Sequence, residues 1–239
     1  MKSVRDSIMT QTDDKRLAAE AALAEIADGM AVGLGTGSTA AFAIAAIGRR
    51  RLSDWPNATF YATSRRTLLM ARDAGVPIAR FDSVAALDLA IDGVDEIDPA
   101  FRAIKGAGGA MLREKIVATA ARRMVVIADG TKAVATLGKA PVPVETLPFA
   151  RAFVADSVAR LGAEPVLRLS ENGRAYRTEQ GNLVLDCRFG TIADPPALSA
   201  ALSAIPGALG HGLFVDQVNA AYIAREGVVT RLARDDLTS

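Results

Sequence analysis

The chain has 239 residues, half of them hydrophobic, and its 28 basic and 27 acidic residues give a formal net charge of +1. This length suits one large domain with or without a smaller companion, and the even charge without a basic stripe predicts no nucleic-acid partner. No apolar run is long enough to predict a membrane span, and the polar first residues do not resemble a signal peptide, so we expect a cytoplasmic protein. The single cysteine, Cys187, and the single histidine, His211, exclude internal disulfides, thiolate clusters, His-rich metal sites and any catalytic triad that needs a second histidine.

Predicted helices and strands alternate through the first half of the chain. We expect residues 1–12 to be a loose start, and Asp13 or Asp14 to cap a helix that runs to residue 27. The later elements of this half are strands at 30–34, 59–62, 77–81, 87–91 and 124–128 and helices at 38–50, 64–74 and 109–123. This alternation predicts an α/β fold with a Rossmann-like, mostly parallel sheet that is flanked by helices.

The pattern changes after about residue 138. The proline-rich stretch 140–148 indicates a linker or an edge strand. The elements after it are helices at 149–161 and 196–205, a strand at 165–169 and a hairpin of 175–177 with 182–187. These elements predict a smaller α+β (ferredoxin-like) domain, and the strand-like runs within 213–232 are expected to return to the first sheet. The expected domains are 1–138 plus 213–239, which is catalytic, and 139–212.

A glycine-rich turn, Gly33-Leu-Gly-Thr-Gly-Ser-Thr39, follows the first predicted strand. Open parallel sheets bind ligands beyond the carboxyl ends of their strands, glycines let the backbone approach a ligand, and a helix start offers free N–H groups to an anion. With the hydroxyls of Thr36, Ser38 and Thr39, the turn predicts a phosphate site. The alternative is a tight turn capped by Ser38 without a ligand. The nucleotide P-loop motif is absent, and the second strand lacks the terminal acidic residue of a dinucleotide site, which disfavours NAD.

An acidic turn follows the strand at 87–91 and contains Asp92, Asp95, Glu96 and Asp98. Carboxylates at the end of a strand can reach the hydroxyls of a substrate in the crevice, and Asp92 and Asp95 are the better placed of the four. Glu96 and Asp98 are expected nearer the loop tip, in solvent. Two alternatives remain open for this turn, a purely structural role and a metal site.

A lysine, a glycine loop and a carboxylate lie close together in the stretch IKGAGGAMLREK. Lys105 precedes the glycine-rich 106–109, where the backbone can approach a ligand. Glu114 follows in a helix whose neighbouring positions three and four residues away carry no basic residue, so burial there would suit it to proton transfer. The alternative is an ordinary solvated glutamate. Lys132, after the strand at 124–128, is either a further ligand contact or a surface lysine.

Together these motifs resemble the ribose-5-phosphate isomerase A family. The resemblance rests on G-x-G-T-G-S-T, D-G-x-D-E-I-D, K-G-x-G-G with R-E-K-I, A-D-x-x-K and P-V-P-V-E in this order, and it extends from Lys15 to Gly227. It implies a Rossmann-like domain that is completed by the C-terminal tail, a small α+β domain, no cofactor, no metal, and a cytoplasmic homodimer or homotetramer.

The resemblance also implies a role for individual residues. It makes Glu114 the proton-transferring residue, and it matches Lys15 to a lysine near the phosphate. The implied substrate-binding residues are Thr36, Gly37, Ser38, Thr39, Asp92, Gly93, Val94, Asp95, Lys105, Gly106, Ala107, Gly108 and Lys132. Ala107 and Val94 depart modestly from the family pattern, Thr131 stands where a serine is common, and no function is expected for His211.

The implied reaction interconverts D-ribose 5-phosphate and D-ribulose 5-phosphate in the non-oxidative branch of the pentose phosphate pathway. We expect an enediolate route in which Glu114 is the base, Lys105 stabilises negative charge, and Asp92 and Asp95 hold hydroxyls. A hydride shift would need a metal held by several carboxylates and histidines. The alternative functions are another sugar-phosphate enzyme of a related fold, such as an aminosugar-phosphate deaminase or a lactonase, and a non-enzymatic sugar-phosphate sensor.

Overall fold

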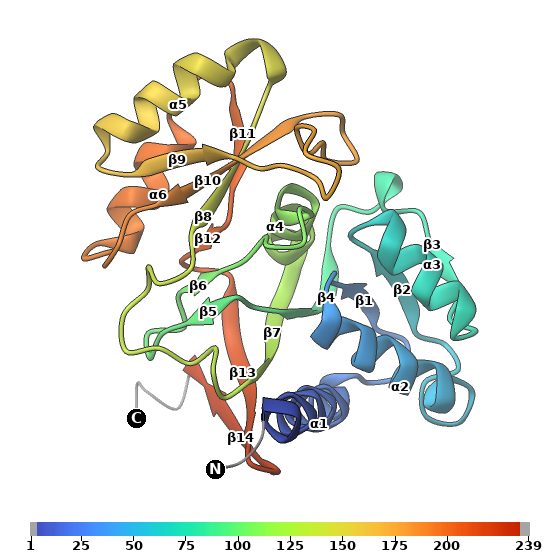
Figure 1. The fold of residues 1–239 in the computed structure, drawn as a ribbon. Helices are drawn as coiled ribbons and strands as arrows, with labels where there is room; N and C mark the ends of the chain where they lie inside the picture. The colour runs from blue at the N-terminus through green and yellow to red at the C-terminus, as the bar shows by residue number, and fades with distance from the viewer. Residues whose placement is uncertain (1–3, 235–239) are drawn as a thin grey trace. The chain divides into compact units, whose positions relative to one another are not determined.

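The computed structural model describes residues 4–234, with side chains from residue 11 onward (Figure 1). The chain divides into two compact units. The first contains the residues up to Val94, Ile116–Ala133 and the residues from Gln217 onward, and the second contains Asp95–Lys115 and Val134–Asp216. Each unit gathers segments that are far apart in the sequence. Compact units are not the same as domains that fold independently, so the domain boundaries expected from the sequence remain a prediction.

A seven-stranded sheet forms the centre of the described part of the first unit, in the order β14-β13-β7-β4-β1-β2-β3. Its strands are β1 (Ala31–Leu34), β2 (Thr59–Ala62), β3 (Ile78–Ala79), β4 (Leu87–Gly93), β7 (Ala121–Asp129), β13 (Val218–Arg225) and β14 (Val228–Ala233). Every neighbouring pair is parallel except β13 with β14. The last six residues of β7 are buried in succession, as is typical of a strand covered on both faces. The predicted mostly parallel α/β sheet is therefore confirmed.

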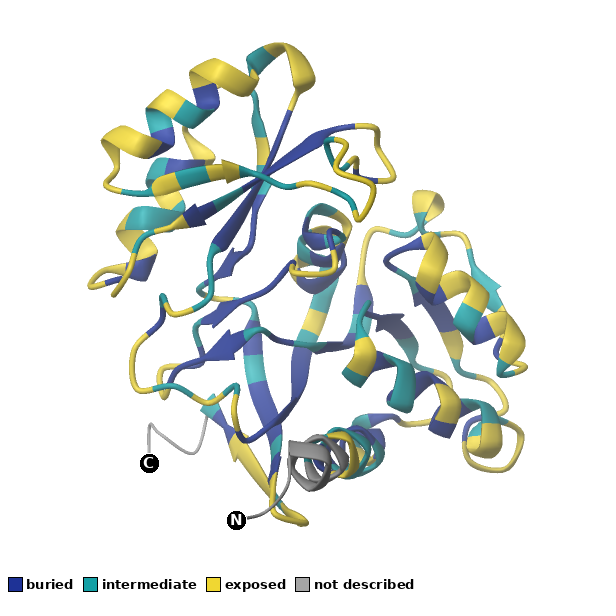
Figure 2. Ribbon diagram, in the orientation of Figure 1, coloured by how far each residue is buried: buried dark blue, intermediate teal, exposed yellow. Residues whose placement is uncertain are grey.

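Helices pack against this sheet through apolar side chains. The helical elements are α1 (Val4–Ala22), α2 (Ser38–Asp54), α3 (Arg65–Asp73), the end of α4 (Met111–Ala120) and the 3-10 turns Leu23–Glu25 and Phe81–Ser83. Ala18 and Ala22 of α1 and Ile44 and Ile47 of α2 belong to the same buried cluster as the apolar side chains of the strands. Figure 2 shows the resulting pattern, with buried strands and helices that are exposed along their outer faces. Within the described residues, none of the helices is long and apolar enough to cross a membrane.

The order of strands creates a switch point beside β1. The chain proceeds from β1 through α2 and β2 to β3 on one side, and then returns to place β4 on the other side of β1. Leu34 lies opposite Ile91, and the N–H of Gly35 donates to the carbonyl of Ile91 at 2.9 Å. In open sheets of this kind the crevice for a ligand lies outside the carboxyl ends of the strands at the switch point. The residues directly after β1 and at the end of β4 are therefore candidates for binding a ligand.

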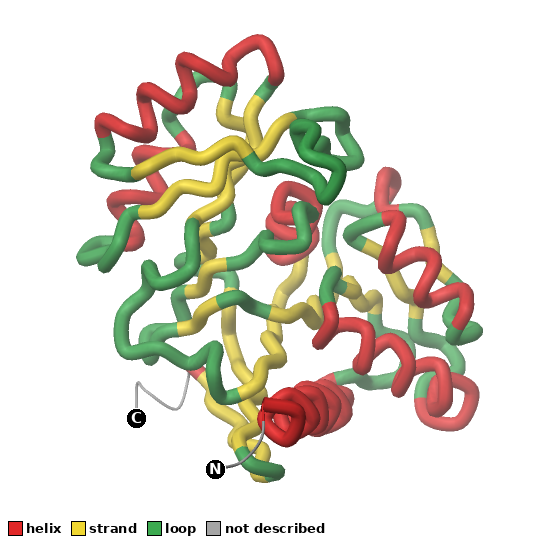
Figure 3. Tube along the Cα trace, in the orientation of Figure 1, coloured by secondary structure: helices red, strands yellow, loops and turns green. Residues whose placement is uncertain are grey.

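The second unit contains a four-stranded antiparallel sheet in the order β11-β8-β10-β9. Its elements along the chain are β8 (Val142–Thr146), the 3-10 turn Pro148–Ala150, α5 (Arg151–Arg160), β9 (Glu164–Leu167), β10 (Leu183–Arg188), α6 (Pro195–Ser203) and β11 (Ala208–His211). This β-α-β-β-α-β sequence is the predicted ferredoxin-like arrangement. Val154 of α5 and Leu202 of α6 pack with Val144 of β8 and Cys187 of β10, so both helices cover one face of the sheet (Figure 3).

A smaller three-stranded sheet completes the second unit, in the order β12-β6-β5. Its strands are β5 (Glu96–Ile97), β6 (Ala103–Ile104) and β12 (Leu213–Phe214). The predicted return of the tail to the first sheet is therefore confirmed for β13 and β14 but wrong for residues 213–214, which pair with β6 instead. Two-residue strands do not have enough length to show an alternating pattern, so no strand was predicted at β5 or β6.

The first helix begins earlier than predicted. α1 starts at Val4, so the expected loose start over 1–12 is wrong for the described residues 4–12, and neither Asp13 nor Asp14 caps it. Asp14 is buried and accepts the N–H groups of Glu226 and Gly227 at 3.0 and 2.8 Å. An aspartate is an equally good acceptor for the N–H groups of a helix start and for those of a distant turn.

Two predictions in the second unit are wrong. Residues 142–146 form neither a linker nor an edge strand, because β8 is completely buried and pairs with both β10 and β11. Pro143 is tolerated there because only its carbonyl is needed, and it accepts the N–H of Gly212 at 2.7 Å. The predicted hairpin of 175–177 with 182–187 is absent, since β10 pairs with β8 and β9 and residue 175 makes only an isolated bridge to Leu169.

Candidate active site

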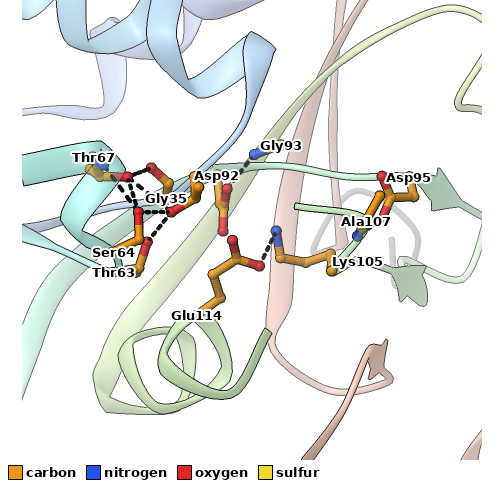
Figure 4. Close-up of polar contacts among 12 residues, drawn as sticks. Gly35, Thr63, Ser64, Thr67, Asp92, Gly93, Asp95, Lys105, Ala107 and Glu114 are labelled. Atoms are coloured by element: carbon orange, nitrogen blue, oxygen red, sulfur yellow. Dashed lines mark hydrogen bonds and ion pairs between the residues drawn. The ribbon is translucent and has the colours of Figure 1, made fainter. Parts of the chain in front are cut away.

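Gly35 and Asp92 occupy the switch point of the first sheet. Asp92 is buried at the end of β4, and one of its carboxylate oxygens accepts the N–H of Gly93 at 2.7 Å (Figure 4). A Cβ atom on Gly35 would lie 1.8 Å from the Asp92 carboxyl carbon, so only a glycine lets this carboxylate occupy its position. The glycine turn therefore leaves space for the carboxylate of Asp92, which sequence spacing did not reveal.

The hydroxyl of Thr36 lies in a cluster of hydroxyls that fixes the glycine turn. Its Oγ1 is 3.0, 2.7 and 2.9 Å from the hydroxyl oxygens of Thr63, Ser64 and Thr67. Thr67 in turn donates to the carbonyl of Gly35 at 2.8 Å. Thr36 was predicted as a donor to a ligand, but the contacts of its hydroxyl are with these three side chains. Its evident effect is to hold the turn in place.

The start of α2 presents Ser38 and Thr39 directly after the turn. Gly37 occupies the N-cap position with a φ of 138°, and no side chain caps the helix, so the predicted alternative of a Ser38 cap is not what forms. The Nζ of Lys15 lies 3.5 Å from the Ser38 hydroxyl. An uncapped helix start with a lysine beside it has the chemistry of an anion site.

The loop after β7 lies in the same unit and contains Lys132. Asp129 accepts the N–H and the hydroxyl of Thr131 and also a hydrogen bond from Gln11 at 3.3 Å. Burial would raise the pKa of Asp129, but the hydrogen bonds of Thr131 and Gln11 and the charge of Lys15 together hold that pKa below its ordinary value. Thr131 thus fixes the Asp129 carboxylate, and the N–H of Lys132 donates to the carbonyl of Asp129 at 3.1 Å.

The glycine loop at 106–109 is held from two sides within the second unit. Asp95 accepts the N–H of Ala107 at 3.0 Å, and the guanidinium of Arg168 donates to the carbonyls of Gly106 and Ala107 at 3.0 and 3.2 Å. Arg168 is itself paired with Asp186. Sequence analysis missed Arg168, because it lies 62 and 61 residues after Gly106 and Ala107 and belongs to no recognisable motif.

Lys105 and Glu114 form a buried ion pair in the second unit. The Lys105 Nζ is 3.4 Å from the Glu114 Oε2, and their side chains are only 2% and 3% exposed (Figure 4). The N–H of Lys105 donates to the carbonyl of Gly212 at 2.8 Å, while Glu114 lies in the first turn of α4. The alternative of a solvated glutamate is wrong. The positions three and four residues from Glu114 carry no basic residue, and Lys105 supplies a basic partner from the loop before the helix.

Glu96 and Asp98 were expected in solvent at the loop tip, and this expectation is wrong. They are 3% and 4% exposed. Glu96 accepts the N–H groups of Gly138 and Ala140, and Asp98 is paired with Arg102 at 2.6 Å. Both carboxylates therefore tie loops of the second unit together. The interpretation of an acidic, purely solvated turn fails because these residues begin β5 and the turn that follows it.

Lys115 and His211 form a second, part-buried polar group that the sequence did not predict. The Lys115 Nζ lies 3.2 Å from the His211 Nδ1, and the His211 Nε2 lies 3.0 Å from the Ser203 hydroxyl. Burial lowers the pKa of Lys115 to about 7, and burial with the nearby Lys115 charge lowers the pKa of His211 to about 3. By contrast, burial raises the pKa of the Cys187 thiol to about 12, so this thiol is unsuited to nucleophilic chemistry.

The two units divide the predicted site residues between them. The first unit contains Thr36, Gly37, Ser38, Thr39, Asp92, Gly93, Val94 and Lys132, together with Lys15. The second unit contains Asp95, Lys105, Gly106, Ala107, Gly108 and Glu114. Among the side chains that the structure describes, no group of three or more histidine, cysteine, aspartate or glutamate residues could hold a metal ion. The absence of a metal and of a cofactor stays a prediction.

Comparison with known proteins identifies the family. The family model of ribose 5-phosphate isomerase A (phosphoriboisomerase A) matches residues 59–227. The chain belongs to the ribose 5-phosphate isomerase A family. Ribose-5-phosphate isomerase A of Roseiflexus castenholzii is 49% identical over 219 residues, which cover 90% of this chain and 93% of that protein. Its counterpart from Sphingopyxis alaskensis is 46% identical over 216 residues, which cover 90% and 94%.

Solved structures of ribose 5-phosphate isomerases have the same fold. A D-ribose-5-phosphate isomerase in complex with phospho-erythronic acid superposes with a TM-score of 0.89 at 35% identity, covering 93% of this chain and 98% of that one. Ribose 5-phosphate isomerase A from Neisseria gonorrhoeae gives a TM-score of 0.87 at 33% identity, covering 94% and 97%. The predicted resemblance, fold class and enzyme class are confirmed: this family member is an aldose–ketose isomerase, and neither a sensor nor another sugar-phosphate enzyme is favoured.

Proposed function

We propose that this chain interconverts D-ribose 5-phosphate and D-ribulose 5-phosphate through an enediolate, with Glu114 as the base. The observation that carries the proposal is the buried Lys105–Glu114 pair at 3.4 Å, in a member of the ribose 5-phosphate isomerase A family. Phospho-erythronic acid bound to a solved relative supports a phosphorylated ligand. The enzyme would act in the non-oxidative branch of the pentose phosphate pathway.

Glu114 carries the proton in this scheme. Its carboxylate removes the proton from C2 of the open-chain aldose, and the electrons of that C–H bond form the C1–C2 double bond of the enediolate. The same carboxyl group then returns a proton to C1, which produces the ketose without any net gain or loss of atoms. A carboxylate that is shielded from water keeps the abstracted proton from exchanging freely.

Lys105 and the glycine loop stabilise the charge that develops on oxygen. The backbone that carries Lys105 is held by the pairing of β6 with β12 and by the hydrogen bond from the Lys105 backbone N–H to the carbonyl of Gly212. The Arg168 contacts fix the carbonyls of Gly106 and Ala107, and therefore fix the orientation of the peptide groups in this loop. Donors that are fixed in advance give the largest benefit to a developing negative charge, because they need not reorganise during the reaction.

Asp92 and Asp95 hold hydroxyl groups of the sugar and move the proton that must pass between O2 and O1. Each carboxylate accepts a backbone N–H, from Gly93 and Ala107 respectively, which fixes its orientation. A carboxylate has about four acceptor positions, so it can accept hydrogen bonds from substrate hydroxyls as well as from a backbone N–H. Either carboxylate also suits the proton transfers of ring opening.

The phosphate group binds to the first unit in this proposal. The uncapped start of α2 supplies N–H groups and the hydroxyls of Ser38 and Thr39, and Lys15 adds a positive charge at 3.5 Å from the Ser38 hydroxyl. Lys132 adds a second lysine from the loop after β7. Thr36 supports this group indirectly, by holding the turn through its contacts with Thr63, Ser64 and Thr67.

The remaining properties follow from the family resemblance. We propose that the enzyme is metal-independent, is cytoplasmic, and assembles as a homodimer or homotetramer. Exhaustive chelation followed by an activity assay checks the first property, because a loss of activity that one metal restores would contradict it. Light scattering of the purified chain measures the mass of the assembly directly.

Measuring ribulose 5-phosphate formed from ribose 5-phosphate tests the function, with Glu114→Gln beside the unmodified chain. We expect the turnover number of the variant to fall by about 10²–10⁴-fold, with KM nearly unchanged, because glutamine keeps the shape and removes the base. Glu171→Gln, at an exposed position of the same unit, is the matched control and should keep full activity. Near-normal turnover in Glu114→Gln would refute the role of Glu114, and an inactive unmodified chain would refute the function.

A further inference from the structure

Both members of the Lys105–Glu114 pair are attached to one short stretch of chain, His211–Phe214, which we call segment 211–214. On the side of Lys105, the attachment is through the backbone. The N–H of Lys105 donates to the carbonyl of Gly212, and β6 pairs with β12, so that Ile104 lies opposite Leu213. The position of Lys105 is thus set by this segment.

On the side of Glu114, the attachment is through the next residue of α4. The Nζ of Lys115 donates to the carbonyl of Leu213 at 2.7 Å and lies 3.2 Å from the Nδ1 of His211. The ring of Phe214 completes the surroundings, with its centroid 4.9 Å from the Lys115 Nζ and 5.5 Å from the Lys105 Nζ. One aromatic ring therefore contacts both ammonium groups.

The tautomer of His211 follows from these contacts. Its Nδ1 faces two donors, the Lys115 Nζ and the N–H of Leu213 at 3.3 Å, so it must act as an acceptor. The ring proton is therefore on Nε2, which donates to the Ser203 hydroxyl at 3.0 Å. His211 is a neutral acceptor that α6 holds in place, and it directs the ammonium group of Lys115.

Lys115 is not held by an opposite charge. Within the described part of the chain, no carboxylate lies within 4.0 Å of its Nζ, whereas Lys105 has Glu114 and Arg113 has Glu179. Shielding an ammonium group partly from water without a counter-ion is unfavourable, so the contact needs a compensating benefit. The geometry indicates that this benefit is the positioning of Glu114, because Lys115 directly follows Glu114 in α4 and is bound to segment 211–214.

We propose that Lys115 is a positioning residue, which fixes the start of α4 against segment 211–214 and thereby sets the separation of Glu114 from Lys105. The proposal rests on the proposed function, in which Glu114 is the base. Lys105 is also hydrogen-bonded to segment 211–214 through its backbone, so the same segment positions both Lys105 and the start of α4. A displacement of about 1 Å at a reacting group can reduce the rate by about 10²-fold, so the loss of this attachment should appear in turnover.

The first experiment compares Lys115→Met with Arg113→Met. Methionine keeps most of the length of lysine but cannot donate to Leu213 or to His211. We expect the turnover number of Lys115→Met to fall by about 10-fold to 10²-fold, while KM changes little, because the phosphate contacts are untouched. Arg113→Met is the matched control, since it removes an exposed cation from the other neighbour of Glu114 without touching segment 211–214, and it should keep its turnover number.

A double-mutant cycle shows whether Lys115 acts through Glu114. If it does, adding Lys115→Met to Glu114→Gln should cause no further loss of the residual turnover, because there is no longer a base to position. A loss in the double variant that equals the loss in Lys115→Met alone would overturn the proposal. Thermal unfolding of each variant is measured in parallel, and turnover is compared at a temperature where all of them are folded.

Substitutions of His211 keep the proposal testable if Lys115→Met does not fold. Asparagine can place an oxygen where Nδ1 accepts from Lys115, whereas glutamine reaches toward Ser203 and loses that acceptor. We expect His211→Asn to retain a higher turnover number than His211→Gln. Equal turnover in these two variants, or an unchanged turnover number in Lys115→Met, would refute the positioning role in an active enzyme. An inactive unmodified chain would instead refute the proposed function.

Discussion

The ammonium nitrogen of Lys105 lies 3.4 Å from the Oε2 of Glu114, and neither side chain is more than 3% exposed. The two residues come from different elements, β6 with its following loop and the first turn of α4. Each charge would be strongly unfavourable in this position alone, and each is compensated by the other. The pair thus links the stability of the second unit to the chemistry proposed for it.

Removing one member of this pair should be worse for stability than removing both. We expect Lys105→Met to lower the free energy of unfolding by about 3–5 kcal/mol, because the Glu114 carboxylate remains buried without its ammonium partner. The double variant Lys105→Met/Glu114→Gln should lose less than the single variant. Urea unfolding at pH 7 measures both values. The exposed pair of Arg113 with Glu179 serves as the control, and Arg113→Met should change stability by only about 0–1 kcal/mol. Strictly additive effects at Lys105 and Glu114 would contradict this account.

A methyl group on Gly35 should displace the carboxylate of Asp92. The added Cβ would lie 1.8 Å from the Asp92 carboxyl carbon, so we expect Gly35→Ala to lower the free energy of unfolding by about 1–3 kcal/mol and to reduce turnover. The same change in an Asp92→Ala background should affect stability much less, because the atoms that collide are then gone. Denaturant unfolding of the four proteins tests this, and an equal loss in both backgrounds would contradict it.

His211 should make the fold less stable in mild acid. Its pKa in the folded protein is about 3, below the ordinary 6.5, so it stays neutral in the fold while the unfolded chain takes up a proton below pH 6.5. Stability is therefore lost as the pH falls from 6.5 toward 3, by at most about 1.4 kcal/mol per pH unit from this group. His211→Asn lacks the titration, so the stability of the unmodified chain relative to this variant should fall between pH 6.5 and pH 5. Urea unfolding at both pH values measures it, and a constant difference would contradict the prediction.

Much of the fold was predictable because the signals that specify it are local. The strand at β2 and the helices α2 and α3 lie where hydrophobic patterns and glycine turns predicted them. The errors lie where a residue has a distant partner. Asp14 has the composition of a helix cap but accepts N–H groups more than 200 residues away, and β8 looks like an edge strand until β10 and β11 pair with both of its sides.

In the candidate site, too, the sequence identified individual residues but not their distant contacts. Sequence order alone identified Lys105, Asp92 and Glu114 as candidates, because Asp92 follows a predicted strand while Lys105 and Glu114 flank a glycine-rich loop. The burial of Glu96, the attachment of the Thr36 hydroxyl and the contacts of Arg168 were not predictable. Each depends on residues that are at least 27 positions apart, and local spacing in the sequence does not indicate such a contact.

The sequence by itself determined the family, the alternation of helices and strands, and the order in which the functional residues occur, since hydrophobic periodicity and turn chemistry act between near neighbours. Only the tertiary structure decided what each of those residues contacts. Lys105 is the ion-pair partner of Glu114, Gly35 leaves space for the carboxylate of Asp92, and Lys115 and His211 form a part-buried pair. These relationships arise from the packing of segments that are distant along the chain, and packing is a property of the folded protein as a whole.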